Sequence, residues 1–157
     1  MGINSVGASL LQNPDSPFNK FKTIGLSITC SADKLITDSA AGATAIATGY
    51  LTKNKYISVD TLQNKLYTIF EHAEKLGLST GLVVTGTVSH ATPAAFVGHT
   101  NDRYDQLSIA LQMTEQDFDV VIGGGLKFFL PKSFSGDRDD NLFLTDKLIS
   151  KGYTFTK

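Results

Sequence analysis

The segment TGLVVTGTV at residues 80–88 is a short apolar run bounded by turn residues. Such a run predicts a β-strand that is covered on both faces, as in a parallel sheet. A second apolar run, FDVVIGG at residues 118–124, follows residues 107–114, whose apolar side chains recur at helical spacing. The order strand, helix, strand is typical of βαβ units, so the sequence predicts an α/β fold with a mostly parallel sheet and helices on both faces.

Two helices are expected before the first strand. Residues 39–48 are rich in alanine, which favours a helix, and Gly49 is well placed to end it. A second helix is expected to begin at Asp60, which with Gln63 resembles a capping box, and to end at Gly77. Its apolar side chains recur at helical spacing, at Leu62, Leu66, Ile69, Phe70, Ala73 and Leu76.

The two ends of the chain are less regular. KTIGLSITC at residues 22–30 alternates in a way that favours a short strand. A last helix is predicted from about residue 141 to 151 and is stopped by Gly152, after which residues 153–157 are expected to begin another strand. No internal repeat interrupts this order, so we predict a single domain over residues 1–157.

The composition limits the partners of the chain. Its 157 residues are 41% hydrophobic and 18% charged, which is typical of a globular domain with a real core. The 14 basic and 15 acidic residues nearly balance, so we expect no nucleic-acid binding driven by net charge. Cys30 is the only cysteine, which excludes an intrachain disulfide and a thiolate-only metal site. No apolar run approaches the ~18 residues of a membrane span, and no signal-peptide pattern follows Met1.

Asp38 and Ser39 stand at the start of the alanine-rich helix. Unpaired backbone N–H groups and the positive helix end favour negative charge there, so a nucleophile could face a phosphate. The small side chains that follow would let a tetrahedral anion and metal ions approach the backbone. Taken alone, however, an Asp-Ser-Ala sequence more often marks a helix cap.

Two longer strings carry a family resemblance. TDSAAGATAIATG at residues 37–49 resembles the nucleophile segment of the alkaline phosphatase family, whose pattern is close to T-D-S-A-A-x-A-T-A-x-x-T-G. VSHATPAAFVGHTNDR at residues 88–103 resembles the metal and arginine segment of that family. Softer matches extend the resemblance over most of residues 35–130. Before residue 35 it is thin, although Met1-Gly2 would correspond to the tail of the family's Gly-Asp-Gly-Met-Gly turn.

The resemblance implies a reaction and three residues that carry it. Ser39 would be the nucleophile that forms a phosphoserine intermediate during hydrolysis of a phosphate monoester, which releases inorganic phosphate. Arg103 would clamp two phosphate oxygens with its planar fork, and Asp38 would hold that guanidinium in place. A free serine hydroxyl is a poor nucleophile at neutral pH, so a zinc ion would activate Ser39.

The resemblance also implies two Zn²⁺ ions and one Mg²⁺ ion in the complete protein. Ser39 would be a zinc ligand, and Thr92 would be a ligand of the magnesium ion. His90 takes the position next to that ion where some members carry an aspartate, and at this point the chain resembles the animal-type members. This departure leaves magnesium occupancy and the pH optimum open.

Most of the implied zinc ligands are missing. Each zinc site needs about four ligands, and the family supplies them from a later half with Asp-x-x-x-His and Asp-His patterns. Neither pattern occurs in this sequence. We therefore expect residues 1–157 to be an incomplete, N-terminal portion of an alkaline phosphatase catalytic domain that is nearly inactive alone.

Blander interpretations remain open for single residues. Thr92-Pro93 suits a simple turn, and an isolated Arg103 would be a solvated surface charge. We expect His72 to lie on the surface, and His99 has no matched ligand role. The GGG at residues 123–125 is expected to mark tight packing at a strand end, because no Lys-Ser/Thr follows to complete a phosphate loop.

Two rival functions remain open. One is a phosphodiesterase or sulfatase of the same superfamily, against which Ser39 argues, because those enzymes usually present threonine or a modified cysteine. The other is a non-catalytic phosphate-binding or scaffold domain. The resemblance further suggests a homodimer and export to the periplasm or the cell exterior, whereas the physiological substrate stays open.

Overall fold

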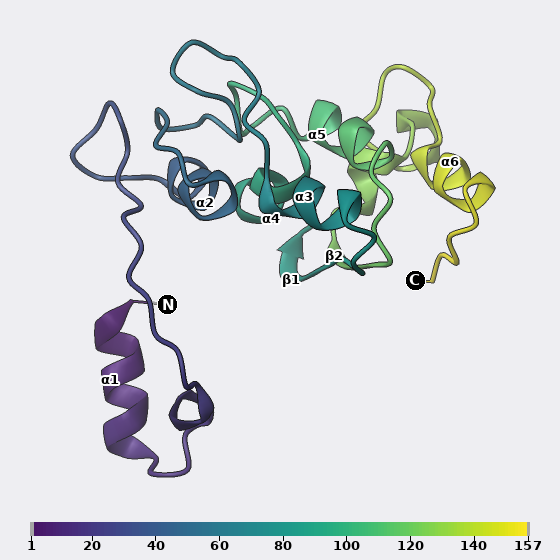
Figure 1. The fold of residues 1–157 in the computed structure, drawn as a ribbon. Coiled ribbons are helices and arrows are strands. Elements are labelled where there is room, and N and C mark those ends of the chain that lie inside the picture. The colour runs from purple at the N-terminus through teal and green to yellow at the C-terminus, as the bar shows by residue number, and fades with distance from the viewer. Residues whose placement is uncertain (1, 157) are drawn as a thin grey trace.

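A computed structural model describes residues 2–156 as short helices packed beside a two-stranded parallel sheet, with an N-terminal arm that extends from this body (Figure 1). The strands are β1 (Gly81–Thr87) and β2 (Val120–Gly124). The helices are α1 (Ile3–Gln12), α2 (Ser39–Thr48), α3 (Ile69–Lys75), α4 (Ala91–Val97), α5 (Gln106–Met113) and α6 (Leu144–Ser150), with 3-10 turns at Pro17–Lys20, Leu126–Phe129 and Lys132–Phe134. The predicted α/β class is confirmed. In this part of the chain no helix has the length and apolar character to cross a membrane.

The two strands are joined by a crossover that contains α4 and α5. They pair in parallel, with Leu82 opposite Val121. At the end of β2 the backbone of Gly123 approaches β1 closely, because an added Cβ would lie 2.7 Å from Cγ2 of Val84 and 2.7 Å from Cγ1 of Val88. Gly125 has a φ of +98°. The expectation that this glycine run marks tight packing is therefore confirmed.

Helices α2 and α4 pack against each other through alanines. Small side chains let two helix backbones approach closely, and the paired positions are almost fully buried. The buried alanines are Ala40, Ala43 and Ala47 from α2 and Ala91, Ala94 and Ala95 from α4. These alanines serve helix packing, whereas our expectation that the small side chains of α2 let an anion and metal ions approach the backbone stays a prediction. The packing brings the N-terminal ends of α2 and α4 to one side of the body.

Helix α3 begins later than predicted. Asp60 does not cap a helix, because its carboxylate accepts the backbone N–H groups of Leu62 and Asn64 in a local turn. The capping box is formed eight residues later by Thr68 and Glu71, each of which accepts the other's backbone N–H. Leu62 is consequently 80% exposed rather than part of an apolar stripe.

The sequence also overestimates the extent of the strands. Residues 22–30 form no strand and expose Ile24, Leu26 and Ile28, since within residues 2–156 they find no partner strand. The expected strand at 153–157 is likewise absent over residues 153–156, and Lys157 lies outside the described residues. Helix α6 begins at Leu144 because Asn141, where we expected its start, has a φ of +57°.

The sheet is not covered on both faces as predicted. Leu82 is buried and Val84 is half-buried, but the neighbouring Val83 is 70% exposed and Ile122 is 57% exposed. The prediction that these two strands are buried on both faces is therefore wrong for the part of the protein that the structure describes. The periodicity of an apolar run shows that a strand is suited to burial, not which neighbours cover it.

Candidate active site

Asp38 and Ser39 occupy different positions at the start of α2. Asp38 is the N-cap, and its Oδ1 accepts the backbone N–H of Ala41 at 2.9 Å. The capping interpretation is thus correct for Asp38. Ser39 is the first helical residue and is exposed, and its hydroxyl makes no hydrogen bond to any other residue in the range 2–156. Its oxygen therefore lies free at the positive end of the helix.

Arg103 joins the ends of α2 and α4. Its Nη1 lies 3.1 Å from Oδ2 of Asp38, and its Nη2 lies 3.2 Å from Nε2 of His90. The ion pair with Asp38 is present, and Arg103 is not the solvated surface charge of the blander interpretation, because its side chain is only 14% exposed. The catalytic roles of these residues stay predictions.

The guanidinium of Arg103 has N–H groups without an acceptor within residues 2–156. A guanidinium carries five N–H groups and no acceptor. Among residues 2–156, only two of these groups have acceptors, one on Asp38 and one on His90. The remaining N–H groups can donate to an oxyanion, and a planar fork suits two oxygens of a phosphate.

The His90 ring is oriented by its contact with Arg103. Because arginine only donates, Nε2 of His90 can take part in this contact only as an acceptor. His90 is the N-cap of α4, but its side chain does not bond to the helix backbone. Its orientation is set by Arg103 rather than by helix capping.

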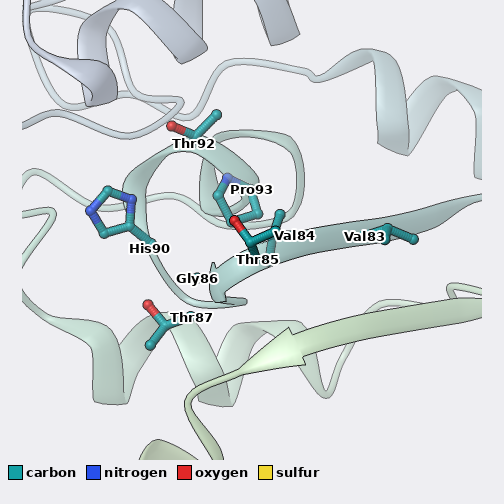
Figure 2. A pocket seen from close by; sticks show the side chains of 8 residues that line it. All are labelled: Val83, Val84, Thr85, Gly86, Thr87, His90, Thr92 and Pro93. Carbon is teal, nitrogen blue, oxygen red and sulfur yellow. The ribbon is translucent and has the colours of Figure 1, made fainter.

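Thr92 is exposed in the first turn of α4, beside a depression of about 430 Å³. Figure 2 shows that this depression lies between the second half of β1 and the start of α4, and that His90 and Thr92 border it. Its lining consists of residues 83–87, 90, 92 and 93. Asp38, Ser39 and Arg103 do not line it, so the depression adjoins the arginine site without containing the predicted nucleophile.

Residues 2–156 do not provide a complete set of metal ligands. Within residues 2–156, no group of three or more His, Cys, Asp or Glu side chains is arranged to hold a metal ion. The hydroxyls of Ser39 and Thr92 and the ring of His90 are suitable donors but too few for the ligand sets of zinc or magnesium.

The charge on Asp38 is stabilised by its neighbours. Burial raises the pKa of this carboxyl, but hydrogen bonds from the N–H of Ala41, the guanidinium of Arg103 and the N–H of Lys55 outweigh burial, so the pKa lies below its ordinary value. Asp38 is therefore ionised at neutral pH. Arg103 therefore has an anionic partner at neutral pH.

Two residues that build this site were not predicted from the sequence. The side-chain oxygen of Asn54 accepts the N–H of Asp38 at 3.0 Å, and the backbone N–H of Lys55 donates to Oδ2 of Asp38 at 3.0 Å. Lys55 has a φ of 73°, a left-handed conformation that costs a residue with a Cβ about 1–2 kcal/mol. The only available signal was an asparagine at a turn position, which is common in loops without function.

The other histidines lie outside the site. His72 is exposed, as predicted. His99 is held between the carbonyl oxygen of Ser58 at 2.7 Å and the carboxylate of Glu71 at 3.2 Å, and its side chain is 6% exposed. These contacts join the loop after α4 to the start of α3, so His99 has a structural role that its sequence context did not indicate.

Comparisons with known proteins agree on one family. A family model described as alkaline phosphatase matches residues 4–157. The chain is 43% identical over 127 residues to an alkaline phosphatase of Schizosaccharomyces pombe, covering 77% of this chain and 24% of that protein. It is 39% identical over 131 residues to alkaline phosphatase 4 of Bacillus subtilis, covering 80% of this chain and 27% of that protein. It thus spans about a quarter of the length of these relatives.

Solved structures show the same fold. The alkaline phosphatase of the Antarctic bacterium TAB5 superposes with a TM-score of 0.84 at 35% identity, over 98% of this chain and 44% of that one. A mutant of that enzyme, with a histidine replaced by aspartate and with Mg bound in a site called M3, gives a TM-score of 0.83 at 34% identity, over 98% of this chain and 43% of that one.

Proposed function

The chain belongs to the alkaline phosphatase family, and on that premise we propose that it carries the nucleophile and the phosphate clamp of a phosphate monoesterase. Ser39 is the proposed nucleophile, Arg103 the clamp, and Asp38 the residue that holds the clamp. The proposal rests above all on one observation. A mostly buried guanidinium is fixed by Asp38 at the start of α2, yet it retains N–H groups for an anionic ligand.

The proposed reaction proceeds in two displacements. Arg103 binds two oxygens of the phosphoryl group, whose negative charge is also favoured by the N-terminal end of α2. The oxygen of Ser39 then forms a bond to phosphorus while the bond to the leaving oxygen breaks, and the alcohol departs with a proton. Water next attacks the phosphoserine, releases inorganic phosphate and restores the serine hydroxyl.

Metal ions belong to the proposal only as partners of the complete protein. We propose two Zn²⁺ ions and one Mg²⁺ ion, to which Ser39, Thr92 and His90 contribute some of the ligands. When bound, a divalent cation lowers the pKa of a coordinated hydroxyl and stabilises charge on phosphoryl oxygens. Since residues 2–156 do not complete such a site, we propose that residues 1–157 are an N-terminal portion of the catalytic domain with little turnover alone. Homodimer formation and export from the cytoplasm are proposed for the complete protein.

The test compares the 157-residue chain with the product of its complete open reading frame. Each is assayed with Zn²⁺ and Mg²⁺ against a phosphate monoester, a phosphate diester and a sulfate ester of the same chromogenic alcohol. We expect metal-dependent hydrolysis of the monoester by the complete product and little by the 157-residue chain. Preference for the diester or the sulfate would instead identify another enzyme of the superfamily. Phosphate binding without turnover in the complete product would identify a binding domain.

A further inference from the structure

We infer that Lys55 is a positioning residue whose backbone joins the Asp38 carboxylate to the main chain of Arg103 and so aims the Arg103 guanidinium. The inference deepens the proposed function, since it rests on Arg103 as the phosphate-binding group. It assigns a role to a residue that has no place in the reaction described above and whose side chain is exposed.

Lys55 holds Arg103 from two sides. Its backbone N–H donates to Oδ2 of Asp38 at 3.0 Å, and the same oxygen accepts Nη1 of Arg103 at 3.1 Å. The carbonyl oxygen of Lys55 accepts the backbone N–H of Arg103 at 2.9 Å. The peptide unit before the Lys55 Cα therefore holds the Asp38 carboxylate, which binds the Arg103 side chain. The peptide unit after this Cα holds the main chain of Arg103.

These two hydrogen bonds depend on the left-handed backbone of Lys55. Lys55 is the third residue of a turn in which the N–H of Tyr56 donates to the carbonyl of Lys53 at 3.2 Å, and its φ is 73°. A turn with positive φ at the third position favours glycine or asparagine. Rotation of φ to a negative value would turn the N–H and the carbonyl away from their present directions. The backbone conformation, rather than the side chain, is thus what the site requires.

The lysine side chain offers a competing explanation. Its Nζ lies 5.9 Å from the ring centre of Tyr104, and Cζ of Arg103 lies 5.8 Å from the same ring. Cation–π contacts with the ring of Tyr104 could therefore position both cations without any contribution from the backbone of Lys55. Substitutions that separate backbone conformation from side-chain charge distinguish the two explanations.

Three variants of the complete open reading frame product make this separation. Lys55→Gly and Lys55→Asn remove the ammonium but tolerate a positive φ, whereas Lys55→Val removes it and disfavours that conformation. Ser135 provides the matched control, because it has a φ of 61° at the end of a 3-10 turn and, within residues 2–156, no hydrogen bond joins it to a residue of the site. Ser135→Val should lower the melting temperature as Lys55→Val does, but it should leave the inhibition constant of inorganic phosphate unchanged.

The readouts are the inhibition constant of inorganic phosphate, kcat/KM and the melting temperature. We expect Lys55→Val to weaken phosphate inhibition and to lower kcat/KM about 10- to 100-fold, because a misplaced binding group loses much of its effect. Lys55→Gly and Lys55→Asn should both stay within about twofold of the parent protein, because the backbone can keep its conformation. If Lys55→Gly loses as much as Lys55→Val, the side chain is responsible and the inference is overturned.

A measurement that does not depend on activity separates this inference from the proposed function. Phenylglyoxal modifies accessible guanidinium groups, and peptide mass spectrometry gives the rate separately for Arg103 and for Arg138, the reference. We expect Arg103 to be modified faster in Lys55→Val than in the parent, Lys55→Gly or Lys55→Asn. Equal rates in all four proteins would overturn the inference. If the modification rates follow this expectation but the protein neither binds nor hydrolyses phosphate, only the proposed function is refuted.

Discussion

The two arginines of the chain, Arg103 and Arg138, are both paired with an aspartate but use their donors differently. Arg138 donates to both oxygens of Asp140 and to the carbonyl oxygens of Leu107 and Phe128, at 2.9 and 3.1 Å. Four of its five N–H groups thus have acceptors on the protein, against two for Arg103 within residues 2–156. The Arg138 side chain is 4% exposed.

This difference separates an arginine that holds the fold from one that can hold a ligand. The donors of Arg138 satisfy carbonyl oxygens of α5 and of the 3-10 turn that follows β2, so this side chain ties two segments together. Arg103 is also mostly buried and also paired with an aspartate, but within residues 2–156 some of its N–H groups have no acceptor, and its partner Asp38 precedes the exposed Ser39 in the chain. Burial of an arginine is therefore a poor guide to its role, and the number of donors still free is a better one.

The largest effect is expected from Ser39→Ala in the complete open reading frame product. The variant should lose at least about 10³-fold in kcat/KM toward a phosphate monoester, because the attacking oxygen is gone. Stability should not change, since Asp38 and not Ser39 caps α2. Ser133→Ala, at an exposed serine far along the chain, is the control for both assays. Substantial turnover by Ser39→Ala would mean that the free donors of Arg103 face another nucleophile.

Arg138→Met should have the next largest effect, and it should be on stability. Removal of the guanidinium leaves two carbonyl oxygens without their donor and Asp140 without its partner, which costs about 2–4 kcal/mol. Urea unfolding gives this loss, and kcat per folded molecule should match that of the parent protein. A variant that unfolds like the parent but loses activity would reverse the roles assigned to the two arginines.

Arg103→Lys should show the opposite pattern. Lysine keeps a positive charge near Asp38 but lacks the planar fork, so the inhibition constant of inorganic phosphate should rise about 10- to 100-fold. The melting temperature should change little, because the charge pair is conserved. Unchanged phosphate inhibition together with a large fall in melting temperature would make Arg103 a second structural arginine.

The smallest effect concerns the pH dependence of the Arg138 pair. Hydrogen bonding from Arg138 is the main cause that lowers the pKa of Asp140, and it outweighs burial, which would raise it. A carboxyl with a lowered folded-state pKa stabilises the fold above its unfolded pKa of about 4, and this contribution disappears as pH falls through the folded pKa. The stability difference between the parent and Asp140→Asn should therefore shrink from about pH 7 to about pH 3. A difference that stays constant would show that the pair does not contribute through its charge.

Local patterns predicted some elements well. Helix α2 follows from its alanine content, and it ends where Gly49 adopts a φ of 78°. The start of α3 was wrong because Asp60 and Thr68 both have side chains that can accept backbone N–H groups, and only the surrounding fold decides which of them caps a helix.

The site itself depends on contacts that no local pattern contains. Asp38 and Arg103 are 65 residues apart, and only the family resemblance brought them together before the structure did. Lys55 and Arg138 were missed because a lysine in a turn and an arginine in a charged segment are typical of solvated surface. Their importance arises from a left-handed backbone at Lys55 and from carbonyl oxygens outside the local sequence pattern around Arg138, which the sequence does not display.

The central claim is that the oxygen of Ser39 receives the phosphoryl group that Arg103 holds. It is tested most directly by acid quench of the complete open reading frame product during turnover of a ³²P-labelled phosphate monoester, followed by peptide mapping. The account predicts covalent label on the peptide that contains Ser39, at Ser39 itself, and none in Ser39→Ala. Label on any other side chain, or turnover without covalent label, would contradict it.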